Sequence, residues 1–388
     1  MNMKNLGVRS QRRVVVIFIA IIFSIGLYVY SRPTVIEISP SMKLNDIEMK
    51  RVVHSNPYTC SGVSPFKIFP PPGIRPFKSK AIVSLLSSED DGQYGVDFYF
   101  LNTLLMAYKL LINERIQLSN QVELAVLITG KLSKLKRDAL LALGVRLIQF
   151  EPLTFKDVVG QVHRWKHCFA KFYMFQMSWF QQMIFFDTDV ILLKSPEPMF
   201  DIMDEFKSNR TNDYFIGAAK QHWNKNGDAL NGGMLMLEPS CYHFQKLVDL
   251  APKKDLYDSK TMEQGLLNYY FKKGGAGPSG IEWQTLPATY NTQQVYERKD
   301  IDFENVVALH EKFWAVGMDN DIYSVWRKEI LELKEFQINT FGDTNVGNVP
   351  EFQKDFFDVV GLKPPYQFSW MFFSNYQLCF SMVRSQQI

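Results

Sequence analysis

Short apolar segments alternate with amphipathic segments between Lys78 and Asp187. The apolar segments have the length of strands, and the amphipathic ones have helical spacing. The expected strands cover 81–86, 122–129, 145–150 and 183–187, and the expected helices cover 99–111, 131–143 and 171–179. Gly144 is expected to end the second helix, because glycine readily adopts the left-handed conformation of a helix cap. This order predicts an α/β domain whose mostly parallel sheet carries helices on both faces and binds ligands at the carboxyl ends of its strands.

An uncharged apolar run covers residues 14–30. As a helix it is roughly 25 Å long, which suits the thinner bilayers of early secretory compartments. Basic residues precede it, so residues 1–13 are expected to be a cytoplasmic tail and the rest of the chain to be translocated. A cleaved signal peptide is the alternative, but the run is long for one and no clear small-residue cleavage site follows. We therefore expect a transmembrane helix that acts as an uncleaved type II signal-anchor in the Golgi or ER membrane.

The remaining chain divides by composition. Residues 31–77 are rich in proline, which locks the backbone and removes hydrogen-bond donors, so they predict an extended stem. Residues 78–335 are expected to form the catalytic domain, and residues 336–388 an aromatic-rich C-terminal extension. No internal repeat is visible.

The charge distribution argues against nucleic acid as a partner. The net charge of +3 misleads, because residues 1–32 hold five basic residues and no acid. The rest of the chain is nearly neutral and offers no basic surface for DNA or RNA. The four cysteines contain no C-x-x-C pair, so zinc is not supported, and their spacing does not assign disulfides.

The triplet Asp187-Thr188-Asp189 directly follows the apolar run 183–186. On an extended chain its two carboxylates point to the same side. Two acids that leave a buried strand together repel each other and lose hydration, which is unfavourable unless a cation joins them. Oxygen ligands of this kind select magnesium or manganese. The alternative is a surface turn, the reading we give to the similar triplets at 300–302 and 319–321, which lie in polar loops.

Further motifs follow in order along the chain. They are AIVSLLSSEDDGQYG from Ala81, FAKF from Phe169, FFDTDVILLKSP from Phe185, NGGMLMLEPS from Asn231, EQGLLN from Glu263, LPATYN from Leu286, and His310 after an apolar run. Together, from about Ala81 to Trp314, they resemble glycosyltransferase family 8, the glycogenin-like retaining enzymes. The resemblance implies a GT-A type, Rossmann-like mixed sheet that is mostly parallel and flanked by helices.

The resemblance also implies roles for single residues. The donor-binding residues would be Leu85, Ser87, Tyr94, Lys171, Asp187, Thr188, Asp189, Gly232, Gly233 and Lys312. The catalytic residues, which orient the transferred sugar, would be Asn231, Glu263 and Gln264. The metal ligands would be Asp187, Asp189 and His310, with Mn²⁺ as the cofactor and Mg²⁺ as the alternative. The sequence departs from the family in two places: Glu263 replaces an aspartate, and the loop between His310 and Lys312 is shortened.

The expected activity is retaining transfer of a hexosyl or pentosyl unit from a UDP-sugar to a lumenal glycan or glycoconjugate. Front-face attack is favoured, with Glu263 only a loose candidate for a nucleophile. One alternative is a self-glucosylating enzyme of the glycogenin type, with Tyr296 near the acceptor position. Another is a catalytically inactive scaffold of a glycosylation complex, for which the two departures leave room. The motifs leave the donor sugar and the oligomeric state open.

Overall fold

The computed structural model describes residues 36–37, 66–71, 76–87, 98–130, 132–160, 163–210, 213–222, 229–295, 301–313 and 321–341. The expected membrane anchor at 14–30, most of the stem, Tyr94, Tyr296 and the tail beyond Phe341 lie outside these ranges, so the expectations about them stay predictions. The end of the expected stem is a correction: Phe66, Ile68 and Phe69 are buried in the core, so this part of 31–77 is packed in the domain and is not an extended spacer. Within the described ranges, no helix combines the length and apolarity that crossing a bilayer requires.

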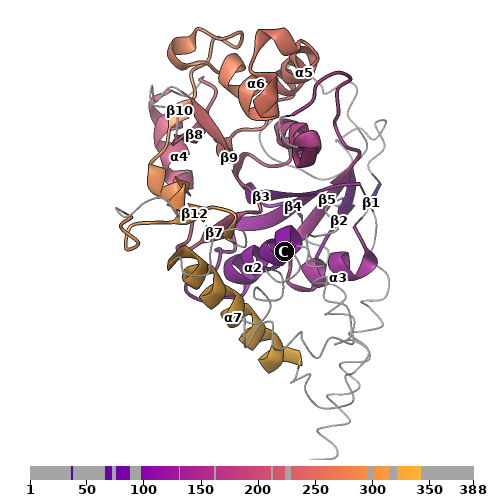
Figure 1. Ribbon diagram of the computed structural model, residues 1–388, viewed down its shortest axis with the longest axis vertical. Coiled ribbons are helices and arrows are strands. Elements are labelled where there is room, and N and C mark those ends of the chain that lie inside the picture. The colour runs from indigo at the N-terminus through magenta and orange to yellow at the C-terminus, as the bar shows by residue number, and fades with distance from the viewer. Residues whose placement is uncertain are drawn as a thin grey trace, which may run out of the picture.

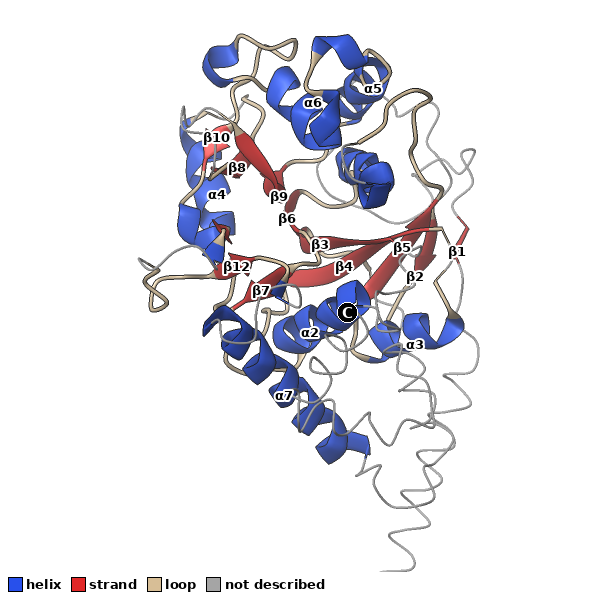
Figure 2. Ribbon diagram, in the orientation of Figure 1, coloured by secondary structure: helices blue, strands red, loops and turns tan. Residues whose placement is uncertain are grey.

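A nine-stranded sheet organises the described part of the chain (Figures 1 and 2). In spatial order its strands are β1 (Ile36–Glu37), β2 (Lys67–Phe69), β5 (Arg146–Phe150), β4 (Val122–Thr129), β3 (Lys80–Ser87), β6 (Gln182–Phe186), β9 (Leu230–Leu237), β8 (Ile216–Lys220) and β10 (Gln284–Thr285). A smaller sheet in the described part joins β11 (Thr292–Gln293), β12 (Ala308–His310) and β7 (Val190–Leu192).

The large sheet is mixed and mostly parallel, as predicted. The central strands β5, β4, β3 and β6 are parallel to one another. β9 is antiparallel to both of its neighbours, β6 and β8, so β8 returns to the direction of the central strands. This reversal matters for the site, because it places the beginning of β9 beside the end of β6, where Met234 lies opposite Phe186.

Helices cover both faces of the sheet (Figure 2). The α-helices are α2 (Phe98–Leu111), α3 (Lys134–Ala142), α4 (Met199–Asn209), α5 (Cys241–Leu250), α6 (Met262–Tyr270) and α7 (Asp321–Phe341). The 3-10 helices are η4 (His163–Gln176), η5 (Lys254–Leu256), η6 (Ser259–Thr261), η7 (Lys273–Gly275) and η8 (Ala288–Tyr290). On one face, β-strand residues such as Ile82 and Val126 pack against α2 and α3. On the other, Val83 and Leu127 pack against η4 and α6.

The core follows from the alternation of side chains along each strand. Every residue of β4 is buried, as expected for a central parallel strand covered on both faces. Its one charged residue, Glu123, forms an ion pair with Arg146 on β5, with 2.9 Å between Oε1 and Nε. Pairing of this kind is how a sheet interior holds charge.

Most of the expected elements are confirmed. β4 has the bounds that we expected, and Gly144 has a φ of 97°, which confirms the left-handed cap after α3. The helix expected at 171–179 is wrong in type and bounds, because a 3-10 helix covers His163–Gln176 instead. Residues 169–175 are all buried. They therefore lack the alternation of apolar and polar faces from which the type and bounds of a helix can be predicted.

Candidate functional site

Asp187 and Asp189 lie at the junction of the two sheets. β6 of the large sheet ends at Phe186, and β7 of the small sheet begins at Val190. The residues between form a turn, in which the Val190 N–H donates to the Asp187 carbonyl oxygen at 3.2 Å. The expected extended chain through the triplet is therefore wrong. The turn, and not the alternation of a strand, brings the two carboxylates near each other.

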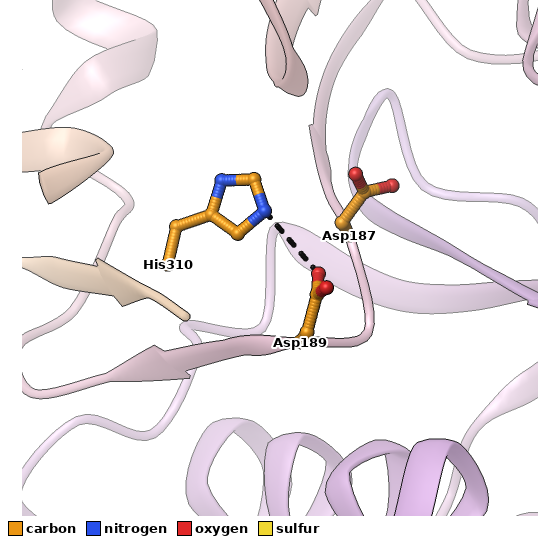
Figure 3. A group of neighbouring side chains, drawn as sticks. All are labelled: Asp187, Asp189 and His310. Carbon is orange, nitrogen blue, oxygen red and sulfur yellow. Dashed lines mark ion pairs between the residues drawn. The ribbon is translucent and has the colours of Figure 1, made fainter. Parts of the chain in front are cut away.

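His310 reaches the same place from β12. This strand is antiparallel to β7, with His310 opposite Val190, and the Glu311 N–H donates to the Asp189 carbonyl oxygen at 3.1 Å. One ligand atom from each of Asp187, Asp189 and His310 lies within 4.8 Å of the others. Figure 3 shows His310 and Asp189 facing each other, with His310 Nε2 3.3 Å from Asp189 Oδ1, and Asp187 beside them. The three residues predicted to hold a metal thus lie together.

The chemistry of this group fits a divalent cation. Two carboxylates and one imidazole are a ligand set that can hold a divalent cation. Asp189 is buried, which by itself raises its pKa. Lys312, whose Nζ lies 2.8 Å from Oδ2, and His310 outweigh that effect and hold the pKa of Asp189 well below its usual range. The carboxylate is therefore kept ionised, as a metal ligand must be.

Lys171 on η4 connects Asp187 to a further acid of the site, Glu263. Its Nζ lies 2.9 Å from Asp187 Oδ1 and 2.9 Å from Glu263 Oε1, and donates to the Gly232 carbonyl oxygen at 3.0 Å. Burial by itself lowers the pKa of Lys171, but the carboxylates of Asp187 and Glu263 outweigh it and raise this pKa above its usual value. The site therefore contains a permanent buried positive charge beside the candidate metal position.

Other predicted site residues lie near the ends of β3 and β6 and the start of β9. Val83 on β3 lies opposite Phe185, so Leu85 and Ser87 continue β3 toward the end of the sheet where Asp187 lies. Thr188 is buried in the turn. Gln264 lies on α6 and accepts a hydrogen bond from the Gly232 N–H at 2.8 Å. These contacts bring α6 and the start of β9 together beside the carboxylates.

Gly233 on β9 allows His310 to approach. A Cβ added at this position would lie 2.1 Å from His310 Cε1 and 2.7 Å from Nδ1. Both distances are shorter than any real carbon contact, so a side chain here would force the imidazole to move. The glycine is therefore required by the close approach of His310 to β9.

We expect Gly233→Ala to weaken Mn²⁺ binding by about tenfold or more, the scale seen when the support of a ligand is lost. Gly232→Ala is the matched control, because its Cβ would meet Gln264 Cβ at an ordinary 3.4 Å. Isothermal titration calorimetry of both variants measures the affinities. Equal affinities for the two variants would show that His310 is not held as the geometry indicates.

Two buried amides in this region were not predicted as site residues. Asn291 Oδ1 lies 2.9 Å from His310 Nδ1, within hydrogen-bond distance, and Gln221 follows β8 directly. Asn291 ends the LPATYN motif, which is a signal in the sequence, whereas Gln221 follows Lys220 and has no comparable signal. Cys168 lies beside Glu263 and Lys171. Burial raises the pKa of its thiol and Glu263 raises it further, which makes it unreactive.

Comparison with models of known protein families matches this sequence to one family. The family model described as "Glycosyl transferase family 8" matches residues 86–314, more than half of the chain. The uncharacterized protein C4C3.09 of Schizosaccharomyces pombe is 22% identical over 293 residues, which cover 62% of this chain and 75% of that protein.

Solved structures of glycosyltransferases are also similar to the chain. GlyE of Streptococcus pneumoniae TIGR4 has a TM-score of 0.44 and 17% identity, with 68% of this chain and 64% of that chain covered. The apo form of mouse xyloside xylosyltransferase 1 has a TM-score of 0.40 and 14% identity, with 60% of this chain and 97% of that chain covered.

Proposed function

The chain belongs to glycosyltransferase family 8, and on this basis we propose that it transfers a sugar from a UDP-sugar to a glycan or glycoconjugate, with retention of the anomeric configuration and dependence on a divalent cation. The convergence of Asp187, Asp189 and His310 carries the proposal. The three lie where the parallel strands of the large sheet end, which is the usual ligand position in such sheets.

We propose Mn²⁺ as the cation, with Mg²⁺ as the alternative, held by Asp187, Asp189 and His310. When bound, such an ion neutralises negative charge on the diphosphate of a nucleotide-sugar. Lys171 and Lys312 would add positive charge from the protein itself. Each ammonium now faces a carboxylate of the site, and each would stabilise the charge that develops on the departing diphosphate.

A front-face reaction is the mechanism that we favour. Glu263, the candidate nucleophile for a double displacement, is buried and paired with Lys171 at 2.9 Å. A carboxylate in that pair is stabilised in place and is a poor nucleophile. The acceptor hydroxyl would then bond to the anomeric carbon on the face from which UDP leaves, and its proton would pass to the departing phosphate oxygen. Gln264 would orient the sugar ring beside this position.

The cellular setting is part of the proposal and rests on the sequence. The apolar run at 14–30, preceded by basic residues, supports a type II anchor with the catalytic part in the Golgi or ER lumen. Protease protection in sealed microsomes tests this. A fragment without residues 1–13 should be protected until detergent is added, and immediate digestion of the whole chain would contradict it.

UDP release from a donor panel is the direct test of the activity. The panel holds UDP-glucose, UDP-galactose, UDP-xylose, UDP-glucuronate and UDP-N-acetylglucosamine, each with and without Mn²⁺. We expect one donor to release UDP only with the cation, because specificity depends on a few hydrogen bonds to ring hydroxyls. A mass increase of the protein itself would indicate self-glycosylation. Binding of UDP without release from any donor would favour an inactive scaffold.

A further inference from the structure

A continuous chain of buried amides connects α6 to the metal ligand His310. Gln264 Nε2 donates to Gln221 Oε1 at 3.1 Å, and Asn231 Nδ2 donates to the same oxygen at 2.7 Å. Asn291 Nδ2 donates to Asn231 Oδ1 at 2.9 Å, and Asn291 Oδ1 lies 2.9 Å from His310 Nδ1. Gln221, Asn231 and Asn291 are 3%, 6% and 1% exposed, so solvent does not compete with these hydrogen bonds.

Two backbone N–H groups fix how the amides of this hydrogen-bonded network are oriented. The Gly232 N–H donates to Gln264 Oε1 at 2.8 Å, and the Gly233 N–H donates to Asn231 Oδ1 at 2.9 Å. A backbone N–H only donates, so the side-chain atoms that face it must be oxygens. The nitrogens of Gln264 and Asn231 therefore both face Gln221, and the Gln221 atom between them must be its oxygen. Two independent donors thus agree on one orientation of the network.

The same reasoning extends to the imidazole. Asn231 Oδ1 is an acceptor, so the Asn291 atom that faces it must be Nδ2, and Asn291 must present its oxygen to His310. His310 Nδ1 then carries a hydrogen, which leaves Nε2 as the nitrogen that can bind a metal. Nε2 lies 3.3 Å from Asp189 Oδ1, among the three ligand atoms of the candidate metal site. The hydrogen bond at Nδ1 thus selects the ring orientation in which Nε2 points into that site.

We infer that Asn291 is a positioning residue, which holds His310 in the tautomer and orientation that bind the cation, and that Asn231 and Gln221 orient Asn291. This inference rests on the proposed metal site, and it gives a role to the asparagine that ends the LPATYN motif. It also assigns Asn231 a function in the protein interior, because its oxygen accepts from both Gly233 and Asn291.

A double-mutant cycle on Mn²⁺ affinity tests the inference. Calorimetry on the full chain compares Asn291→Leu in the wild-type background and in the His310→Ala background. We expect Asn291→Leu to weaken Mn²⁺ binding by about 10- to 100-fold in the first and to have no further effect in the second. Equal weakening in both backgrounds, or none in the wild type, would overturn the inference, because a merely structural residue does not act through His310.

A second variant keeps the test informative if Asn291→Leu does not fold. Asn291→Asp retains an oxygen for the Nδ1 hydrogen, and carboxylates commonly support metal-binding histidines in this way. It should bind Mn²⁺ more tightly than Asn291→Leu in the wild-type background. Repeating it in the His310→Ala background separates this effect from that of the added charge. A gain of the same size in that background would count against the inference.

Controls separate failure of the inference from failure of the metal site. Asn102→Leu removes another buried amide, one on α2 that accepts a hydrogen bond from Trp326 Nε1 at 2.9 Å, and it should leave Mn²⁺ affinity unchanged. If His310→Ala and Asp189→Asn both bind Mn²⁺ as the wild type does, the metal site itself is wrong. If these two weaken binding and Asn291→Leu does not, only the role of Asn291 is wrong.

Discussion

Replacement of Asp187 with asparagine is expected to lower Mn²⁺-dependent sugar transfer by about 100- to 1000-fold, the range seen when one stabiliser of a developing charge is lost, which here is the cation that Asp187 would hold. Asparagine keeps the shape of the side chain and removes its charge, so it binds a hard cation weakly. Lys171 keeps its second partner, Glu263, so the site should stay folded. The measurement is kcat/KM for UDP release with the active donor and Mn²⁺.

The chain contains its own control for this variant. Asp302 belongs to another Asp-x-Asp triplet, but it is exposed in a loop, where its carboxylate accepts hydrogen bonds from Asn305 and from the Glu304 N–H. Asp302→Asn should transfer sugar at the wild-type rate. If Asp187→Asn also keeps that rate, the metal assignment is wrong. If both variants lose activity alike, the effect is not specific to the site.

Lys171→Met should lower the free energy of unfolding by about 3–5 kcal/mol, because removal of one partner from a buried ion pair leaves the other charge uncompensated. Glu263 would be the stranded charge, since its side chain is only 6% exposed, whereas that of Asp187 is 27% exposed. Urea unfolding followed by circular dichroism measures the loss. The result also shows how much of the stability of the fold depends on the buried ion pair of the candidate site.

Two further variants show whether the loss in the free energy of unfolding comes from the buried ion pair. Lys80→Met breaks an exposed pair with Asp204, with 2.9 Å between the charged atoms, and should cost no more than about 1 kcal/mol. The double variant Lys171→Met/Glu263→Met replaces the buried pair by apolar side chains and should regain most of the lost stability. If Lys171→Met unfolds at the same urea concentration as the wild type, the buried pair contributes nothing to the fold.

The sequence predicted the central sheet well because its strands are locally encoded. β3, β4, β5 and β6 are apolar runs of strand length, and their parallel order follows from the helices or helix-like segments between them. The reversal of β9 was not predictable, because pairing with β6 depends on contacts between distant parts of the chain. The residues of β9 would be apolar whether the strand were parallel or antiparallel to β6, so hydrophobicity does not indicate its direction.

The candidate site, like the sheet, was predicted from the sequence only in part. Asp187 and Asp189 were predicted from their residue types and their position after an apolar run, and His310 was predicted from the resemblance to glycosyltransferase family 8. The three converge. The turn at Asp187 was only the alternative interpretation of the triplet, although aspartate is common in turns. The apolar strand that precedes the triplet favoured an extended chain instead. Asn291 and Gln221 were missed for a different reason: their importance depends on which atom of each amide faces its neighbour, and only the assembled structure defines that.

The pairing of β12 with β7 has a consequence for synthesis of the protein. Asp189 and Lys312 are 123 residues apart, and His310 lies just before Lys312. At about 5–20 residues per second, a ribosome needs roughly 6–25 seconds to add that length. During this interval the early strands can form while the two aspartates have neither their histidine nor the lysine that neutralises Asp189. Cation capture therefore becomes available only to a chain that has been translated past β12.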